Sequence, residues 1–102
     1  MLFKTNSFLN PYEWHNHFKA LSGELVDFLA QQGVRLVGID TPSIDPANDK
    51  ELESHQAVFR HDMDILEGIL LQQVPVGEYT LIALPLRLAG SDASPVRAIL
   101  IR

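Results

Sequence analysis

The sequence contains no cysteine, and this absence excludes a disulfide framework and thiolate catalysis. It also suits a reducing compartment. Basic residues are few, since 8 Lys and Arg stand against 13 Asp and Glu and give a formal net charge of −5. The basic residues are scattered. We therefore expect neither nucleic acid nor an anionic membrane as a partner, because both require basic patches.

Long apolar runs are also absent. None approaches the roughly 20 residues that a membrane-spanning helix requires. The first residues, MLFKTNSFLNPYEW, lack the charged segment and following apolar segment of a signal peptide, so we expect a cytoplasmic protein. There is no Gly-rich phosphate loop, no G-x-S-x-G and no C-x-x-C. The serine-hydrolase, nucleotide-binding and zinc-finger classes therefore find no support.

What the sequence does contain is enough apolar material for one folded domain. It has 102 residues, of which 46% are hydrophobic, and both values are typical of a single globular domain. Apolar spacing and turn residues predict strands over residues 2–5, 34–39, 79–88 and 96–101, and helices near residues 11–18, 21–31 and 48–60. About four strands and three helices indicate an α/β fold with a mixed sheet.

The first half of the chain contains the clearest pattern. Leu21, Leu25 and Leu29 recur at helical spacing, and Gly33 is placed where a helix commonly ends. The apolar run at 34–39 then reads as an interior strand covered on both faces. A loop with two prolines, residues 40–46, leaves the carboxyl end of this strand. Ligands collect at that end in open α/β sheets.

The next helix is predicted to bring a histidine to the core. Asn48 and Glu51 resemble a capping box. Leu52, His55 and Phe59 then share one helix face, which we interpret as core-facing. Several strands look fully buried although few helices are available to cover them. The chain is therefore expected either to oligomerise or to form part of a larger layered domain.

The main candidate site is the pair His55 and Glu67, which are 12 positions apart. Glu67 interrupts the apolar run ILEGILL, and an ionised carboxylate is costly to bury without a partner. Imidazole and carboxylate are both ligands of zinc, so a divalent metal is one possible partner. In the alternative interpretation, Glu67 pairs with Arg60 or Arg87 and His55 is an ordinary core histidine.

Other polar residues are weaker candidates. His15 and His17 stand two positions apart and cannot share a helix face, so we interpret them as solvated. The stretch His61–Asp64 offers further donors but is typical of a polar helix end. Asp40 and Asp45 flank the proline loop, where most aspartates brace a turn.

Three long motifs resemble a known family: GVRLVGIDTPSIDP, LESHQAVFRHDMDILEGILL and VPVGEYTLIALPLRLAGSDASPVRAIL. They are similar to the carboxyl-terminal half of bacterial kynurenine formamidases, the arylformamidases of the metal-dependent cyclase family. The resemblance runs from about residue 2 to the last residue. It implies a swivelling β/β/α fold, a homodimer, and one or two divalent ions, with zinc expected. It also implies hydrolysis of N-formyl-L-kynurenine to L-kynurenine and formate in tryptophan catabolism.

The resemblance implies that His55 and Glu67 are metal ligands. Family members are about twice as long, and their amino-terminal half contains an H-x-G-T-H-x-D-x-P-type motif with the remaining ligands and a proton-transferring histidine. This motif is absent here. We therefore expect residues 1–102 to be a single, partial domain without catalytic residues of its own, inactive alone and weak in metal binding. Two alternatives remain open: a non-enzymatic oligomerising α/β module, and a related hydrolase of another amide or a lactone.

Overall fold

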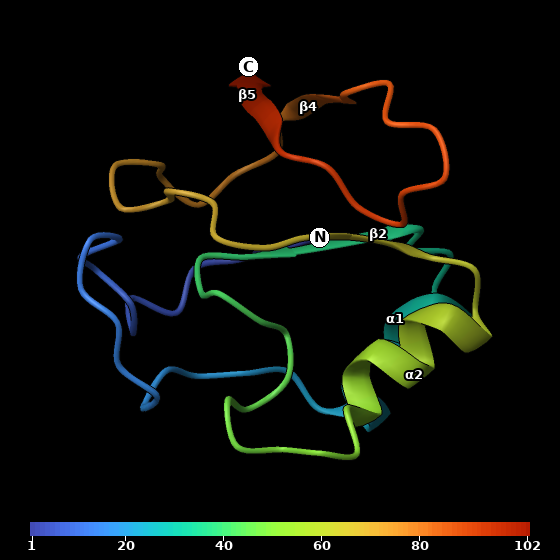
Figure 1. Cartoon of the computed structure of the whole chain (residues 1–102). Helices are drawn as coiled ribbons and strands as arrows, with labels where there is room; N and C mark the ends of the chain where they lie inside the picture. The colour runs from blue at the N-terminus through green and yellow to red at the C-terminus, as the bar shows by residue number, and fades with distance from the viewer.

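The computed structural model describes residues 1–102 as two sheets and two helices (Figure 1). In chain order, the elements are β1 (Leu2–Phe3), α1 (Gly23–Gln31), β2 (Leu36–Ile39), α2 (Glu53–Arg60), β3 (Asp64–Leu66), β4 (Thr80–Pro85) and β5 (Val96–Ile101). The α/β class is confirmed. With 9 and 8 residues, neither helix is long enough to cross a membrane.

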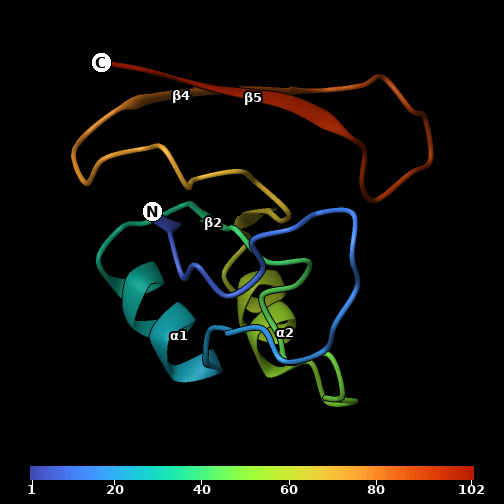
Figure 2. The same ribbon diagram turned by 90° about the vertical axis from the view of Figure 1, so that its left-hand side faces the viewer.

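The strands β1, β2 and β3 form a parallel sheet in that order. The two helices lie side by side on one face of this sheet (Figures 1 and 2). The main core forms between them, where apolar side chains of α1, β2 and α2 meet. Its members are Leu21, Val26, Leu29, Val37, Ile39, Ile44, Ala57, Val58 and Met63. The interior strand predicted at residues 34–39 is confirmed at 36–39.

The strands β4 and β5 form a separate antiparallel hairpin, with ladder pairs from Thr80↔Ile101 to Pro85↔Val96. The hairpin lies on the side of the parallel sheet opposite to the helices (Figure 2). The prediction of one mixed sheet is therefore wrong, because the parallel and antiparallel strands occupy two sheets. Pro85 is compatible with the strand because it is the last residue of β4.

The helix predicted near residues 11–18 does not form, so the structure has two helices rather than three. The segment is an irregular loop. The Asn10 Oδ1 atom accepts a hydrogen bond from the Tyr12 N–H, and the His15 Nδ1 atom accepts one from the His17 N–H. Such local side-chain bonds compete with helical backbone bonds. Aromatic side chains of the loop also pack around Phe8.

The helix α1 ends as the sequence predicts, but it begins at Gly23, two residues after the predicted start at residue 21. The Ser22 Oγ atom accepts a hydrogen bond from the Leu25 N–H and thereby caps the first turn. After the last turn, Gly33 adopts a φ of 87°, a left-handed conformation that favours glycine.

Two predictions about α2 are wrong. The residue at the N-cap position is Leu52 and not Asn48. The side chain of Leu52 forms no capping hydrogen bond. The buried face contains Ser54, Ala57 and Val58, whereas Phe59 is 89% exposed. This face buries Ala57 and Val58. Ser54 can join them because its Oγ atom donates a hydrogen bond to the Leu21 carbonyl at 2.9 Å, which lowers the cost of burying the hydroxyl.

Candidate metal centre

Glu67 lies directly after β3, at the carboxyl end of the parallel sheet. Its side chain is 31% exposed, so the expectation of a carboxylate buried among apolar residues is wrong. The neighbours in the apolar run differ in environment. Leu66 is buried, whereas Leu70 is 70% exposed to solvent. The Glu67 carboxylate is therefore in contact with solvent.

Glu67 nevertheless has a specific partner. The Nε2 atom of His55 lies 3.3 Å from its Oε2 atom. The histidine comes from the first turn of α2, and its side chain is 34% exposed. The two side chains thus converge from a helix start and a strand end. Both remain reachable from solvent, as a site that accepts an ion or a substrate must be.

The loop that follows β2 holds the carboxylate of Glu67. The Ile44 N–H donates to Glu67 Oε2 at 2.9 Å. The residue after Glu67 is bonded to the same loop, since the Gly68 N–H donates to the Thr41 carbonyl at 2.8 Å. Within the loop, the Thr41 hydroxyl donates to the Ser43 carbonyl at 2.8 Å. The loop at the carboxyl end of the strand is therefore part of the site, as its position predicts.

The same loop holds the histidine through Asp45, which is 1% exposed. Its Oδ1 atom accepts a hydrogen bond from the Ser54 N–H at 2.9 Å. Its Oδ2 atom accepts one from the His55 N–H at 2.9 Å and lies 2.7 Å from His55 Nδ1. Burial alone would raise the pKa of Asp45. The backbone hydrogen bonds from His55 and Ser54, followed by the imidazole, outweigh burial, so the pKa is lowered.

The spacing of the two exposed donors fits a shared ion. Zinc–nitrogen and zinc–oxygen bonds of about 2.0–2.2 Å at a tetrahedral angle place two ligand atoms about 3.3–3.5 Å apart. The observed separation between His55 Nε2 and Glu67 Oε2 is 3.3 Å. It is longer than an ordinary N–H···O hydrogen bond of about 2.9 Å. Donor chemistry and spacing therefore fit a zinc-type cation.

The alternative partners of Glu67 are wrong. Arg60 instead forms an ion pair with Asp27 of α1, with its guanidinium nitrogen 2.8 Å from Asp27 Oδ1. Arg87 forms no ion pair, and His55 is the one Lys, Arg or His side chain within 4.0 Å of the Glu67 carboxylate.

The remaining candidates lie outside the site. The rings of His15 and His17 stack on each other with centroids 6.3 Å apart, in the exposed loop. The His61 Nε2 atom lies within hydrogen-bonding distance of Asp27 Oδ1, at 2.8 Å, and this contact joins the end of α2 to α1. Asp40 accepts hydrogen bonds from the backbone N–H and the hydroxyl of Thr5, 35 positions away, so it connects β2 to the first segment of the chain instead of bracing its own turn.

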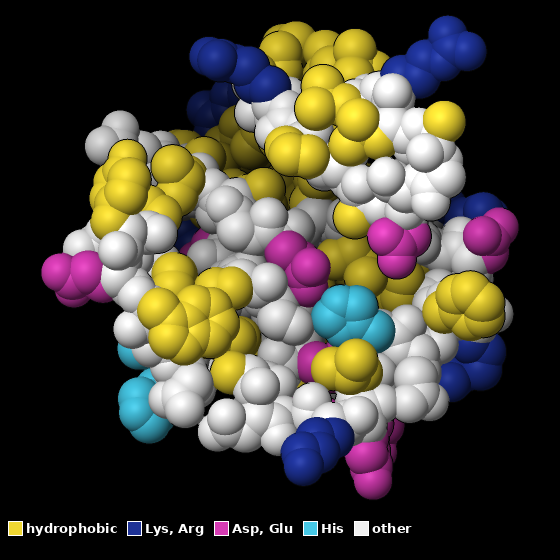
Figure 3. Space-filling model, viewed as in Figure 1, with side chains coloured by type: hydrophobic (Ala, Val, Ile, Leu, Met, Phe, Trp, Pro, Cys, Tyr) yellow, Lys and Arg dark blue, Asp and Glu magenta, His cyan; other side chains and the backbone are white.

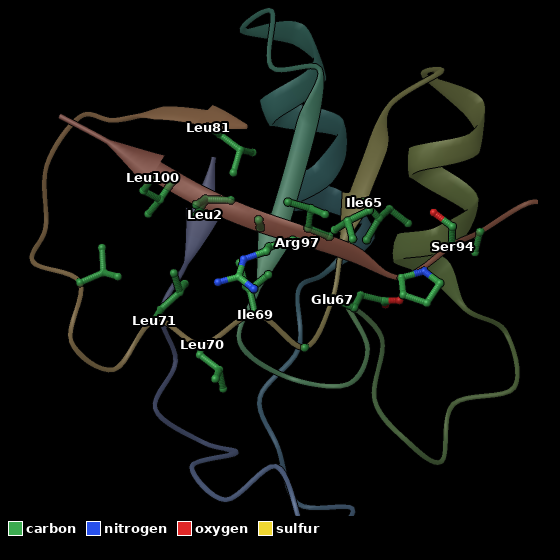
Figure 4. A pocket seen from close by; sticks show the side chains of 17 residues that line it. Leu2, Ile65, Glu67, Ile69, Leu70, Leu71, Leu81, Ser94, Arg97 and Leu100 are labelled. Carbon is green, nitrogen blue, oxygen red and sulfur yellow. The ribbon is translucent and has the colours of Figure 1, made fainter. Parts of the chain in front are cut away.

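This chain contributes two outward-facing donors and not a complete ligand set. Nowhere do three or more His, Asp or Glu side chains form a group that could hold a metal ion. Beside Glu67 lies a largely apolar cavity of about 840 Å³ between the parallel sheet and the hairpin. Figure 4 shows Glu67 and Ser94 at the same end of this cavity and Arg97 near its middle.

The sequence predicts the pair His55 and Glu67 and places the loop at a ligand-binding end of the strand, but it does not indicate how Ile44 and Asp45 hold the two side chains. Its place beside the proline loop predicts that Asp45 braces a turn, and Asp45 precedes the histidine by ten positions. No helix-capping pattern has that spacing. The contribution of Ile44 is a backbone N–H, which every residue except proline possesses. No signal in the sequence distinguishes either of them.

Comparison with known proteins supports a hydrolase fold. No protein-family model matches the chain. One similar solved structure, described as a "Potential Metal-Dependent Hydrolase With Cyclase Activity", is 35% identical over 97% of this chain, with a TM-score of 0.86. Another, a "predicted metal-dependent hydrolase from Bacillus stearothermophilus", is 37% identical over 97% of this chain, with a TM-score of 0.82.

The match covers only part of those proteins. The chain spans 48% of the first structure and 47% of the second, or about half of each. At this identity and TM-score, both the sequence and the arrangement of elements correspond. The chain is therefore similar, in sequence and in fold, to about half of a cyclase-like, metal-dependent hydrolase.

Proposed function

We propose that this chain is the carboxyl-terminal, metal-binding part of a metal-dependent hydrolase. In this proposal, His55 and Glu67 are two ligands of a divalent cation, with zinc the ion that suits them. The observation that carries it is their convergence from separate elements to 3.3 Å, at the carboxyl end of a parallel sheet. The similarity to solved metal-dependent hydrolases supports the same function.

A zinc-type ion supplies Lewis acidity and lowers the pKa of a bound water toward neutrality. Within this chain, His55 and Glu67 would hold such an ion through their facing atoms, Nε2 and Oε2. The Ile44 N–H and the Asp45 carboxylate hold these two side chains in place. The remaining ligands and the group that transfers a proton come from the other half of the enzyme in this proposal. This division accounts for a site with two donors.

For the substrate we propose N-formyl-L-kynurenine, cleaved to L-kynurenine and formate. This finer assignment depends on the resemblance of the three sequence motifs to kynurenine formamidases. A homodimer and a cytoplasmic location belong to the same proposal. A related hydrolase of another amide or a lactone would use the same two ligands, so the substrate needs its own test.

The metal proposal is tested by titrating the purified chain with zinc and following the side-chain NMR signals of His55. We expect weak, saturable binding that is abolished by His55→Gln and by Glu67→Gln. Matched controls are His15→Gln and Glu24→Gln, which alter the same residue types at exposed positions away from the site. Zinc binding that survives both site variants would contradict the proposal.

The reaction is tested by complementation. The chain alone should release no kynurenine from N-formyl-L-kynurenine in the presence of zinc. Adding the remaining half of the Bacillus stearothermophilus protein as a separate polypeptide should give zinc-dependent release, which His55→Gln should abolish. Turnover by the chain alone, or turnover unaffected by His55→Gln, would refute the division of the site.

A second candidate function is a non-enzymatic oligomerising module. The apolar β4–β5 hairpin favours it, because none of its residues is buried. The zinc titration separates the two functions, since only the hydrolase requires His55 and Glu67 to share an ion.

A further inference from the structure

We propose that Asp45 is a positioning residue that fixes the tautomer of His55 and directs its Nε2 lone pair toward Glu67. This inference rests on the proposed function for its purpose, because a neutral imidazole binds a metal through an unprotonated nitrogen. The geometry on which it stands belongs to the chain itself.

The first step concerns the protons. An ionised carboxylate can only accept hydrogen bonds. Asp45 lies 2.7 Å from His55 Nδ1, so that nitrogen must be the donor. In a neutral ring, Nε2 then carries no proton. Its lone pair points away from Asp45, toward the side on which Glu67 Oε2 lies at 3.3 Å.

The second step concerns rigidity. Asp45 is 1% exposed and both of its oxygens are occupied, one by the Ser54 N–H and the other by the backbone and ring of His55. The carboxylate is thereby fixed to the first turn of α2. Because it contacts the backbone and the ring of the same residue, it restrains the ring relative to the helix.

The third step separates this role from helix capping. The two backbone hydrogen bonds alone would stabilise the start of α2, where a carboxylate also interacts favourably with the helix dipole. The contact with Nδ1 adds nothing to the cap. A carboxylate behind the ring of a histidine is, however, a common arrangement at metal sites, where it fixes the tautomer and raises ligand basicity.

The experiment is long-range ¹H–¹⁵N NMR of the histidine side chains in the full 102-residue chain, recorded above the pH at which the ring signals stop changing. His55→Gln assigns the signals. We expect His55 to carry its proton on Nδ1. In Asp45→Ser, which keeps a capping oxygen on a side chain too short to reach the ring, the proton should move largely to Nε2. Zinc binding should weaken by about 10–100-fold.

The matched control is Asp40→Ser, which removes the other buried loop carboxylate, one that contacts Thr5 and Asn6 instead of a histidine. It should leave the His55 tautomer unchanged. A proton on Nε2 in the unaltered chain would overturn the inference, as would an unchanged tautomer in Asp45→Ser. If the tautomer behaves as expected but zinc does not shift His55, the proposed function fails while the positioning role of Asp45 stands.

Discussion

Residues 1–71 and residues 72–102 differ sharply in burial. Every buried residue of the chain lies at or before Leu71, and none lies after it. The later region is nevertheless rich in apolar residues, as the stretch YTLIALPLRL shows. Its exposed large hydrophobic side chains are Val76, Ile82, Leu84, Leu86, Leu88, Ile99 and Ile101. Hydrophobic sequence alone therefore does not determine burial; a second layer must be available to cover it.

The candidate metal centre belongs to the first region, where helix and strand ends are fixed by a core. The hairpin carries apolar side chains on both faces and has only the parallel sheet beneath it. Figure 3 shows hydrophobic side chains gathered at the surface over β4 and β5, at the top of the view. The similar hydrolases are about twice as long, and under the proposed function further polypeptide would cover this surface.

The largest expected effect comes from matched Ile→Ala changes in the two regions. Ile39 in β2 is 0% exposed, whereas Ile99 in β5 is 45% exposed. Ile39→Ala should lower the free energy of unfolding by about 2–5 kcal/mol, because it leaves a cavity in the core. Ile99→Ala should lower it by less than about 1 kcal/mol. Urea denaturation measures both. Equal losses would mean that the hairpin belongs to the same core.

Association through the hairpin should show the next largest effect. We expect the chain to self-associate at high concentration, because exposed apolar faces and free strand edges favour it. The double change Ile82→Lys and Ile99→Lys alters a cross-strand pair. It should weaken association at least about tenfold, or about 1.4 kcal/mol. Light scattering over a concentration series measures this.

The control for that experiment adds the same charge elsewhere. Gln31→Lys and Gln32→Lys, at the exposed end of α1, change the net charge equally. Association should persist in this control. A monomeric unaltered chain at high concentration, or equal loss in both double variants, would show that the hairpin surface is not the cause.

A smaller effect on the free energy of unfolding is expected when one glycine in each region is replaced by alanine. A Cβ added at Gly38 in β2 would lie 2.5 Å from Leu2 Cδ2 and 3.2 Å from Ile69 Cδ1. Gly38→Ala should therefore cost about 1 kcal/mol, since the end of the Leu2 side chain must shift. Gly77→Ala, before β4, meets nothing closer than 3.6 Å and should be nearly neutral. The urea denaturation midpoints of the two variants measure the difference. An unchanged midpoint in Gly38→Ala would show that the Leu2 side chain of β1 moves aside without cost.

The smallest effect should come from the ion pair between the helices. Hydrogen bonds from Arg60, and then from His61, lower the pKa of Asp27 below its ordinary value of 3.8. The stability that this carboxylate contributes is therefore complete above pH 3.8 and is lost as the pH falls through the lower pKa of the folded state. Asp27→Asn should slightly lower the urea midpoint at pH 7 and reduce the loss that follows acidification.

The matched change in the hairpin region is Asp92→Asn, in the exposed turn between β4 and β5. Asp92 forms no ion pair, so the midpoint at pH 7 should not change. If both variants respond alike, the contact of Asp27 with α2 contributes nothing to stability.

The sequence was a good guide where local rules decide the outcome. Gly33 marks the end of α1, and the strand at 36–39 follows from its apolar run. The same rules failed at residues 11–18, where side-chain bonds to the backbone replace a helix. They also failed at α2, where Ser54 can face the core because its hydroxyl finds the Leu21 carbonyl, a partner 33 positions away.

By itself, the sequence determined the α/β class and, through the family resemblance, indicated His55 and Glu67 as candidate ligands. Only the tertiary structure decided that their side chains meet, that Asp45 lies behind the imidazole, and that the hairpin stays uncovered. The physical reason is the sequence separation of the residues that interact. Helix caps and strand patterns depend on neighbouring residues, whereas a shared site and a covered surface depend on which distant segments pack together.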